Sequence, residues 1–97
     1  MREDRIEISL TKACDLAYNF LINNDYQKGF IGVYELPDKW IFRGRMFKGN
    51  FVEYGGNPIS VSKKDGIIEW FPFSVVENHR AYLKSEDVKV DEKYLYH

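Results

Sequence analysis

The chain has 97 residues, of which 44% are hydrophobic and 16% aromatic, and its 14 basic and 15 acidic side chains leave a formal charge of −1. This length suits one domain with one hydrophobic core, and the apolar content excludes an intrinsically disordered chain. The near-zero charge argues against a dedicated nucleic-acid-binding protein and against a polybasic membrane-surface module. We therefore expect a single domain over residues 1–97, with its core between about 8 and 84.

The cysteine content and the N-terminal residues bear on the compartment. A single cysteine, Cys14, can form neither an internal disulfide nor a thiolate metal site, which favours a reducing compartment. Residues 1–7 are charged rather than apolar, and no apolar run approaches the roughly 20 residues of a membrane span. These features predict a cytoplasmic protein without a membrane partner.

The first predicted element is an amphipathic helix from Ser9 to Asn23. Apolar residues recur there at spacings of three and four: Leu10, Ala13, Cys14, Ala17, Tyr18, Leu21 and Ile22. Ser9 is a suitable N-cap because its hydroxyl can accept from an unpaired amide of the first turn. Cys14 lies in the middle of the apolar stripe, so we interpret it as a small buried hydrophobe rather than a reactive thiol.

From Gly29 onward the period of the sequence changes to two, and aromatic and β-branched residues dominate. This pattern predicts strands over residues 30–36, 39–47 and 51–54. Pro37-Asp38 and Gly49-Asn50 supply the turn residues between them.

The segment Gly55-Gly56-Asn57-Pro58 interrupts the strand pattern. A phosphate-binding loop would need a following helix whose amides meet the anion, but an alternating strand, Ile59–Ser62, follows here. Glycine tolerates positive φ and proline lacks an amide proton, so Gly55, Gly56 and Pro58 predict a sharp turn into that strand.

Asp65-Gly66 is a favoured pair for a two-residue hairpin loop. Such a loop places Ser62 opposite Glu69 and Val61 opposite Trp70. A three-residue loop would instead place Val61 opposite Glu69, so the two-residue loop is the better prediction.

A second, short helix is predicted from Ser74 to about Lys84. Ser74-Val75-Val76-Glu77 has the form of a capping box, and apolar residues continue at helical spacing. Residues 85–97 show no sustained period, which leaves a loose tail and a late edge strand as alternatives.

No catalytic, metal-binding or cofactor-binding motif is recognisable, so we expect a protein that is not an enzyme. The two histidines, His79 and His97, are too far apart to form a helical ligand pair. His79 falls on the apolar side of the second predicted helix, which favours a partly buried imidazole over a catalytic base. A nucleophilic pair of Cys14 and His79 would require both side chains to leave their packing faces.

The predicted strand 39–47 is apolar on both sides and also carries cations. Arg43 and Arg45, interleaved with Trp40 and Phe42, would suit a single-stranded nucleic acid, but they share a face with Lys39, which is the ordinary pattern of a solvated strand face. One main helix covers only one sheet face. The remaining apolar surface therefore requires the second helix, a homodimer or another protein.

Several of these features, taken in order, resemble the immunity protein 35 family of bacterial polymorphic toxin systems. They are the early helix, the aromatic strand Trp40-Ile41-Phe42, Gly55-Gly56-Asn57-Pro58, the strand from Ile59 to Lys63 and the turn Lys64-Asp65-Gly66. The resemblance spans about residues 8–83, and the chain departs from the family pattern at Asn57, where a glycine commonly precedes the proline. It implies a small α+β protein that neutralises a cognate toxin by binding it, and some relatives are described as chaperone-like.

The sequence thus predicts an α+β domain in which a long N-terminal helix packs on an antiparallel sheet of about four to five strands, with a short second helix. The predicted function is non-enzymatic binding of a toxin domain; a chaperone-like holdase and a small-ligand-binding domain are the alternatives. We expect partner contacts at residues with the side-chain types common in binding hot spots and at the glycine-rich turn: Trp40, Arg43, Arg45, Tyr54 and Asn57. Gly55, Gly56, Pro58, Asp65 and Gly66 are expected to be architectural.

Overall fold

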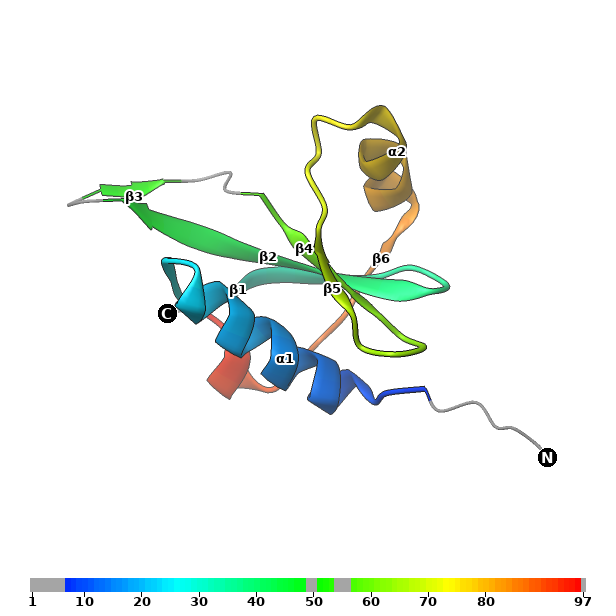
Figure 1. Ribbon diagram of the computed structural model, residues 1–97, viewed down its shortest axis with the longest axis horizontal. Helices are drawn as coiled ribbons and strands as arrows, with labels where there is room; N and C mark the ends of the chain where they lie inside the picture. The colour runs from blue at the N-terminus through cyan, green and yellow to red at the C-terminus, as the bar shows by residue number, and fades with distance from the viewer. Residues whose placement is uncertain (1–6, 49–50, 54–56, 97) are drawn as a thin grey trace.

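The computed structural model describes residues 7–48, 51–53 and 57–96. Within these residues the chain has an α+β fold, in which a long helix packs on one face of an antiparallel sheet and a shorter helix lies on the other side (Figure 1). The predicted fold class is therefore confirmed. The elements are α1 (Leu10–Asn23), β1 (Tyr26–Glu35), β2 (Lys39–Lys48), β3 (Phe51–Glu53), β4 (Ile59–Ser62), β5 (Ile68–Trp70), α2 (Val76–Lys84), β6 (Glu86–Asp87) and the 3-10 turn η1 (Glu92–Tyr94).

The sheet is centred on the long strands β1 and β2. The described strands lie in the order β5-β4-β2-β1-β6, and β3 pairs with the C-terminal end of β2. All of these pairs are antiparallel. β5 is therefore one edge of the sheet and β6 the other.

Helix α1 begins where the sequence predicts. The Ser9 hydroxyl accepts a 3.1 Å hydrogen bond from the Lys12 amide, which satisfies one of the unpaired donors of the first turn. After Asn24, Asp25 adopts a positive φ of 68° and turns the chain directly into β1. The apolar stripe of the helix, including Cys14, is buried against the sheet.

Strand β1 begins at Tyr26, four residues before the predicted start. The pairing with β2 shifts register between Tyr26 and Phe30 and again between Phe30 and Gly32, so the strand is bulged there. A bulge places an extra residue in one strand and interrupts the alternation of side chains. Because this part of the strand lacks a period of two, the sequence pattern did not predict it.

The predicted register of the β4–β5 hairpin is wrong. Ser60 pairs with Glu69 and Val61 pairs with Ile68, and the Ser62 amide donates to the Ile67 carbonyl. The connection is therefore longer than the predicted two residues. It is stabilised by Asp65, whose carboxylate accepts from the Ile67 amide, and by Gly66, whose φ is +78°. The pairing differs from the prediction by two residues, so every side chain keeps its predicted face.

The predicted capping box of α2 does not form. Val75 is the N-cap, no side chain caps this end, and the Val75 carbonyl accepts from the His79 amide. The Asn78 side-chain amide instead donates to the Pro72 carbonyl, which fixes the helix to the segment after β5. The predicted C-terminus of the helix, at Lys84, is correct.

The C-terminal segment is ordered by three attachments. β6 pairs with β1, Tyr94 in η1 is only 7% exposed, and the Tyr96 amide donates to the Phe30 carbonyl. Of the two alternatives, the edge strand is correct, although it is only two residues long. The rest of the segment contributes to the core.

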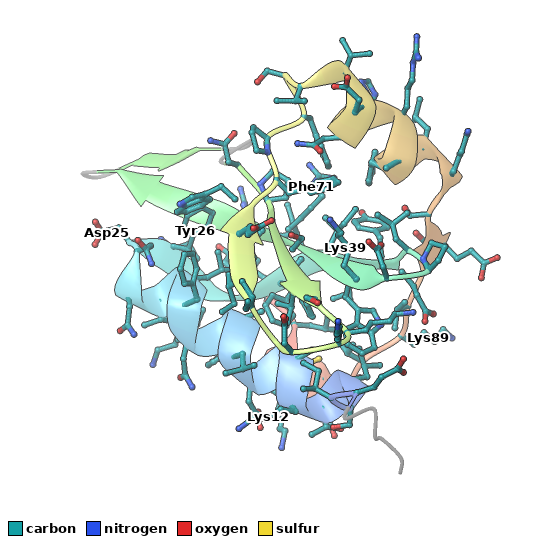
Figure 2. The ribbon with its side chains drawn as sticks, turned by 45° about the vertical axis from the view of Figure 1, so that its right-hand side comes forward. Lys12, Asp25, Tyr26, Lys39, Phe71 and Lys89 are labelled. Carbon is teal, nitrogen blue, oxygen red and sulfur yellow. The ribbon has the colours of Figure 1, made fainter. Side chains whose placement is uncertain are left out.

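Side chains pack on both faces of the sheet. The larger core lies under α1 and contains Phe30, Val33, Trp40, Phe42, Ile59, Val61 and Tyr94 with the apolar stripe of the helix. A smaller cluster on the other face contains Leu36, Ile41 and Phe71, with Tyr34, Phe73, Ala81 and Tyr82 packed against it. Figure 2 shows Tyr26 on the α1 side of the sheet and Phe71 on the α2 side. Ile41 and Phe42 are both fully buried, as a strand that is apolar on both sides requires.

Candidate functional site

Helix α2 covers only part of its sheet face. None of its residues is buried, and its large apolar side chains Val76 and Leu83 are 59% and 69% exposed. The helix packs on the sheet through an aromatic layer formed by its own Tyr82 with Tyr34 and Phe73. The centre of the Tyr82 ring lies 4.9 Å from that of Tyr34 and 4.5 Å from that of Phe73. A hydrogen bond with Tyr34, together with burial, raises the pKa of Tyr82, so this phenol is neutral at physiological pH.

Two cations from β2 lie against the same layer. The Lys39 Nζ atom is 5.6 Å from the centre of the Phe71 ring, and the Arg43 Cζ atom is 5.9 Å from the centre of the Phe73 ring. Such contacts are favourable because the ring face is electronegative. The Phe73 ring also packs against Tyr82 of α2, so Arg43 lies beside that helix.

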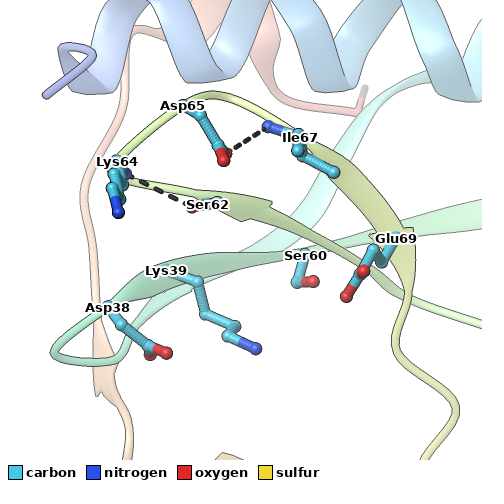
Figure 3. Close-up of a pocket in the computed structure, with 8 residues that line it drawn as sticks. All are labelled: Asp38, Lys39, Ser60, Ser62, Lys64, Asp65, Ile67 and Glu69. Atoms are coloured by element: carbon cyan, nitrogen blue, oxygen red, sulfur yellow. Dashed lines mark hydrogen bonds between the residues drawn. The ribbon is translucent and has the colours of Figure 1, made fainter. Parts of the chain in front are cut away.

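The open part contains a hollow of about 350 Å³, and Figure 3 shows it from the side. This volume is at the low end of ligand pockets, so it suits one large side chain or a small molecule. Its lining comes from the β1–β2 turn, β4, the following turn and β5: Asp38, Lys39, Ser60, Ser62, Lys64, Asp65, Ile67 and Glu69.

Ser60 and Glu69 line one side of the hollow. They are directly opposite each other on β4 and β5, and both project from the sheet into the hollow (Figure 3). Ser60 is 3% exposed, and its hydroxyl makes no hydrogen bond with any residue that the structure describes. The exposed Glu69 carboxylate likewise has neither an ion pair nor a hydrogen bond among those residues. The hollow is open to solvent, so water or an external donor can reach both groups.

Asp65 has a different role in the same hollow. Its carboxylate accepts a 3.0 Å hydrogen bond from the Ile67 amide, and this bond lowers the pKa of Asp65. The group is therefore ionised at neutral pH and tied to the turn. Gly66, the next residue, has a φ of +78°, a conformation that favours glycine.

The five predicted contact residues do not form one surface. Trp40 is only 7% exposed and lies in the α1-side core, whereas Arg43 lies on the α2 side. Arg45 lies in a third place, with its Cζ atom 4.9 Å from the centre of the Tyr96 ring. Asn57 is exposed, and its backbone carbonyl accepts from the Tyr26 hydroxyl. Tyr54, together with Gly55 and Gly56, lies outside the described residues.

The predicted role of Pro58 as the start of a strand fits its position. Pro58 is buried immediately before β4, and its carbonyl accepts a 2.8 Å hydrogen bond from the Phe71 amide. Proline has no amide proton, so it is suited to the end of the β4–β5 hydrogen-bond ladder, where only its carbonyl takes part.

Cys14 and His79 lie on opposite faces of the sheet. Burial, reinforced by the nearby Asp15 charge, raises the pKa of Cys14 to about 11, which leaves a neutral thiol in the core. His79 is exposed, not partly buried as predicted, and its ring stacks on Phe73 on the α2 side of the sheet. Within residues 7–48, 51–53 and 57–96, no three His, Cys, Asp or Glu side chains are grouped as metal ligands.

The sequence prediction placed the contact residues on β2, where cations and aromatic residues gather, and did not include Ser60 or Glu69. A usable signal was present: Ser60 and Ser62 alternate with the buried Ile59 and Val61, so both serines were bound to share the face opposite α1. What the pattern could not reveal is that α2 leaves this part of the face uncovered.

Comparisons with known proteins add no family assignment. No protein-family model, curated protein or solved structure matches this chain. Separately, none of the helices in the described part of the chain is long and apolar enough to cross a membrane.

Proposed function

We propose that this chain is a non-enzymatic binding protein that neutralises a cognate bacterial toxin domain in the cytoplasm by direct contact, as its resemblance to the immunity protein 35 family implies. The contact surface is the open part of the α2-side sheet face. The observation that carries this assignment is the pair Ser60 and Glu69, whose polar groups face a hollow without partners among the described residues.

The groups around this pair favour recognition of another protein. Lys39 lines the hollow with its Nζ atom over the Phe71 ring, and Arg43 lies over the Phe73 ring beside α2. Cations and aromatic rings beside an open polar pocket are typical of the centre of a protein interface, where a partner side chain fills the pocket.

The test combines capture and affinity measurement. The tagged protein is used to recover partners from a lysate of the organism that produces it, and mass spectrometry identifies them. Calorimetry then measures binding of the purified partner to three proteins: the unmodified chain, Ser62→Arg, which fills the hollow, and Asn19→Arg. Asn19 is exposed on α1, on the far side of the sheet, so it is a matched control for added charge and bulk.

We expect one stoichiometric partner, at least about tenfold weaker binding by Ser62→Arg, equal to about 1.4 kcal/mol, and binding by Asn19→Arg within threefold of the unmodified chain. Binding by Ser62→Arg within threefold of the unmodified chain would place the interface elsewhere. Many substoichiometric partners would support the chaperone-like alternative, and the exposed Val76 and Leu83 on α2 would then be the first residues to substitute. A small molecule that displaces no protein but raises the melting temperature would support the ligand-binding alternative.

A further inference from the structure

The edge of the sheet beside the hollow has backbone groups that no described residue satisfies. β5 pairs only with β4, and no described strand lies on its other side. The alternation of an antiparallel ladder decides which groups are free. The Ser62 amide donates to the Ile67 carbonyl, and the Phe71 amide donates to the Pro58 carbonyl, so residues 67, 69 and 71 direct their backbone groups toward β4.

The amides and carbonyls of Ile68 and Trp70 consequently point away from the sheet. No hydrogen bond from the described residues reaches them. Natural sheets usually protect such an edge with a very short strand, charged side chains, proline or a covering segment, because an exposed edge accepts another strand. β5 is three residues long and carries one charged side chain, Glu69, but it includes neither proline nor lysine, and no described strand covers it.

The side chains of β5 define what an added strand must carry. Ile68 and Trp70 face the α1 side, where Trp70 is 45% exposed and its ring lies 5.3 Å from that of Phe20. Glu69 faces the hollow, next to the Ser60 hydroxyl. A strand paired with β5 places one residue directly opposite Glu69, with its β-carbon about 4.5–5.5 Å away. A cation at that position reaches an unpaired carboxylate and a hydroxyl that both accept hydrogen bonds.

A second copy of this chain fits the edge poorly. Antiparallel self-pairing centred on Glu69 would place two carboxylates face to face, which is destabilising. A shift in one direction pairs Ile68 with Pro72, which has no amide proton. A shift in the other direction pairs Trp70 with Gly66, whose φ is +78° and whose amide is already bonded to Ser62. Each register therefore loses a hydrogen bond or opposes like charges.

We infer that the β5 edge binds an extended segment of the partner protein, which adds a strand to the sheet and directs an arginine or lysine into the hollow against Glu69 and Ser60. The segment has the order apolar, basic, apolar, because its two flanking residues lie beside Ile68 and the exposed Trp70. Adding a strand to a sheet edge is a general mode of peptide recognition, in which backbone hydrogen bonds supply affinity and alternate side chains supply specificity. This inference rests on the proposed function, since it names the part of the partner that is recognised.

The test uses short peptides and the unmodified chain. The probe is an acetylated and amidated peptide of sequence Thr-Val-Arg-Val-Thr. A first control peptide has glutamate in place of arginine, and a second has both valine nitrogens methylated, which removes the donors that face Ile68 and Trp70. Amide chemical shifts and amide exchange are followed by NMR as each peptide is titrated to millimolar concentration.

We expect the arginine peptide to move the Ile68 and Trp70 amide resonances and to slow their exchange with solvent. The glutamate peptide should bind at least threefold more weakly, and this difference should shrink in high salt because the ion pair is screened. The methylated peptide should give no saturable shift. In the variant Glu69→Gln, the preference for arginine over glutamate should disappear while the backbone shifts remain.

Three results would overturn the inference: equal binding of the methylated peptide, shifts confined to residues away from β5, or no shift with any peptide. Doubling of the protein's mass in sedimentation, with protection of the same amides in the absence of peptide, would assign the edge to a second copy and also overturn it. The proposed function is judged separately. If capture yields a single partner but the peptides fail, the binding role stands and the β5 edge is excluded; if the peptides bind but no partner is captured, the edge assignment survives without the toxin.

Discussion

The hydroxyl of Tyr94 donates a 2.6 Å hydrogen bond to the Asp15 carboxylate, joining residues that are 79 positions apart in the sequence. Tyr94 is almost fully buried, and its ring packs against those of Tyr18 on α1 and Phe30 on β1, which also contact each other. The C-terminal segment therefore closes the edge of the core between helix and sheet. Its attachment gives the fold a measurable dependence on pH.

The first prediction concerns alkaline stability. The hydrogen bond with Asp15, together with burial and nearby negative charge, raises the pKa of Tyr94 to about 12, whereas an unfolded tyrosine has a pKa of about 10. The folded state favours the neutral phenol, so this contribution to stability is complete below pH 10 and is lost as the pH rises toward 12. Urea unfolding followed by circular dichroism from pH 8 to 11.5 should show the free energy of unfolding falling above pH 10.

The variant Tyr94→Phe isolates this contribution. It should lower the melting temperature at pH 7 by a few degrees and should weaken the loss of stability above pH 10. Some loss should persist, because burial also raises the pKa of Tyr26 and the bond with Tyr34 raises that of Tyr82. A variant whose pH profile runs parallel to that of the unmodified protein would contradict the role of the Asp15 bond.

The second prediction concerns Gly29, where the chain passes closest to the C-terminal segment. Gly29 has a φ of +99°, and a β-carbon placed there would lie 2.5 Å from the Leu95 carbonyl carbon. Gly29→Ala combines backbone strain of about 1–3 kcal/mol with a clash against backbone atoms that cannot rotate away. We expect the C-terminal segment to detach, which hydrogen exchange would detect as faster exchange of the Tyr96 amide.

A neighbouring substitution provides the control. Lys28 is exposed in the same strand, so Lys28→Ala should change the free energy of unfolding by no more than about 0.5 kcal/mol. Retention of slow Tyr96 exchange in Gly29→Ala would show that β1 relaxes around the new methyl group, and the close approach would then not be a constraint.

The pattern of Ser9 to Asn23 was sufficient to predict α1 because the period, the N-cap and the buried stripe all agree. The two sides of β2 could also be predicted, since Ile41 and Phe42 are neighbours and both apolar. These elements are determined by local periodicity combined with burial, which a single sequence records well.

The errors arose where longer-range contacts decide the structure. The turn between Ser62 and Ile67 is stabilised by the Asp65 carboxylate and by two long-range hydrogen bonds of Lys63, whose amide donates to the Asp38 carbonyl and whose carbonyl accepts from the Ile8 amide. The Asp-Gly pair alone therefore did not determine the loop length. Similarly, Tyr94 is buried by α1 and β1, which are distant in sequence. The candidate site required the position of α2, and no local pattern gives the extent of the face that a helix leaves uncovered.

The third prediction concerns Cys14. Burial raises its pKa from 9.0 to about 11, so at pH 8 the thiolate fraction is about 100-fold smaller than for an unperturbed cysteine. The side chain is also only 1% exposed, which blocks direct access by a reagent. Labelling with a thiol-reactive disulfide at pH 8 should therefore be at least about 100-fold slower than in urea. A similar rate under both conditions would contradict the buried position of Cys14.

The fourth prediction compares a buried with an exposed apolar side chain. Phe42 is fully buried against Phe30, with ring centres 4.8 Å apart, whereas Leu83 on α2 is 69% exposed. Phe42→Ala should destabilise the fold by about 3–5 kcal/mol through lost burial and the cavity left behind, and Leu83→Ala should cost no more than about 0.5 kcal/mol. Because a small domain can unfold under the larger loss, Phe42→Leu serves as a milder variant, with an expected cost of about 1 kcal/mol. The urea midpoints of unfolding measure all three costs, provided that the dependence of the unfolding free energy on urea concentration is the same in each variant. A cost for Leu83→Ala above about 2 kcal/mol would indicate that α2 is packed more tightly than its exposure implies. The open face beside it would then be smaller.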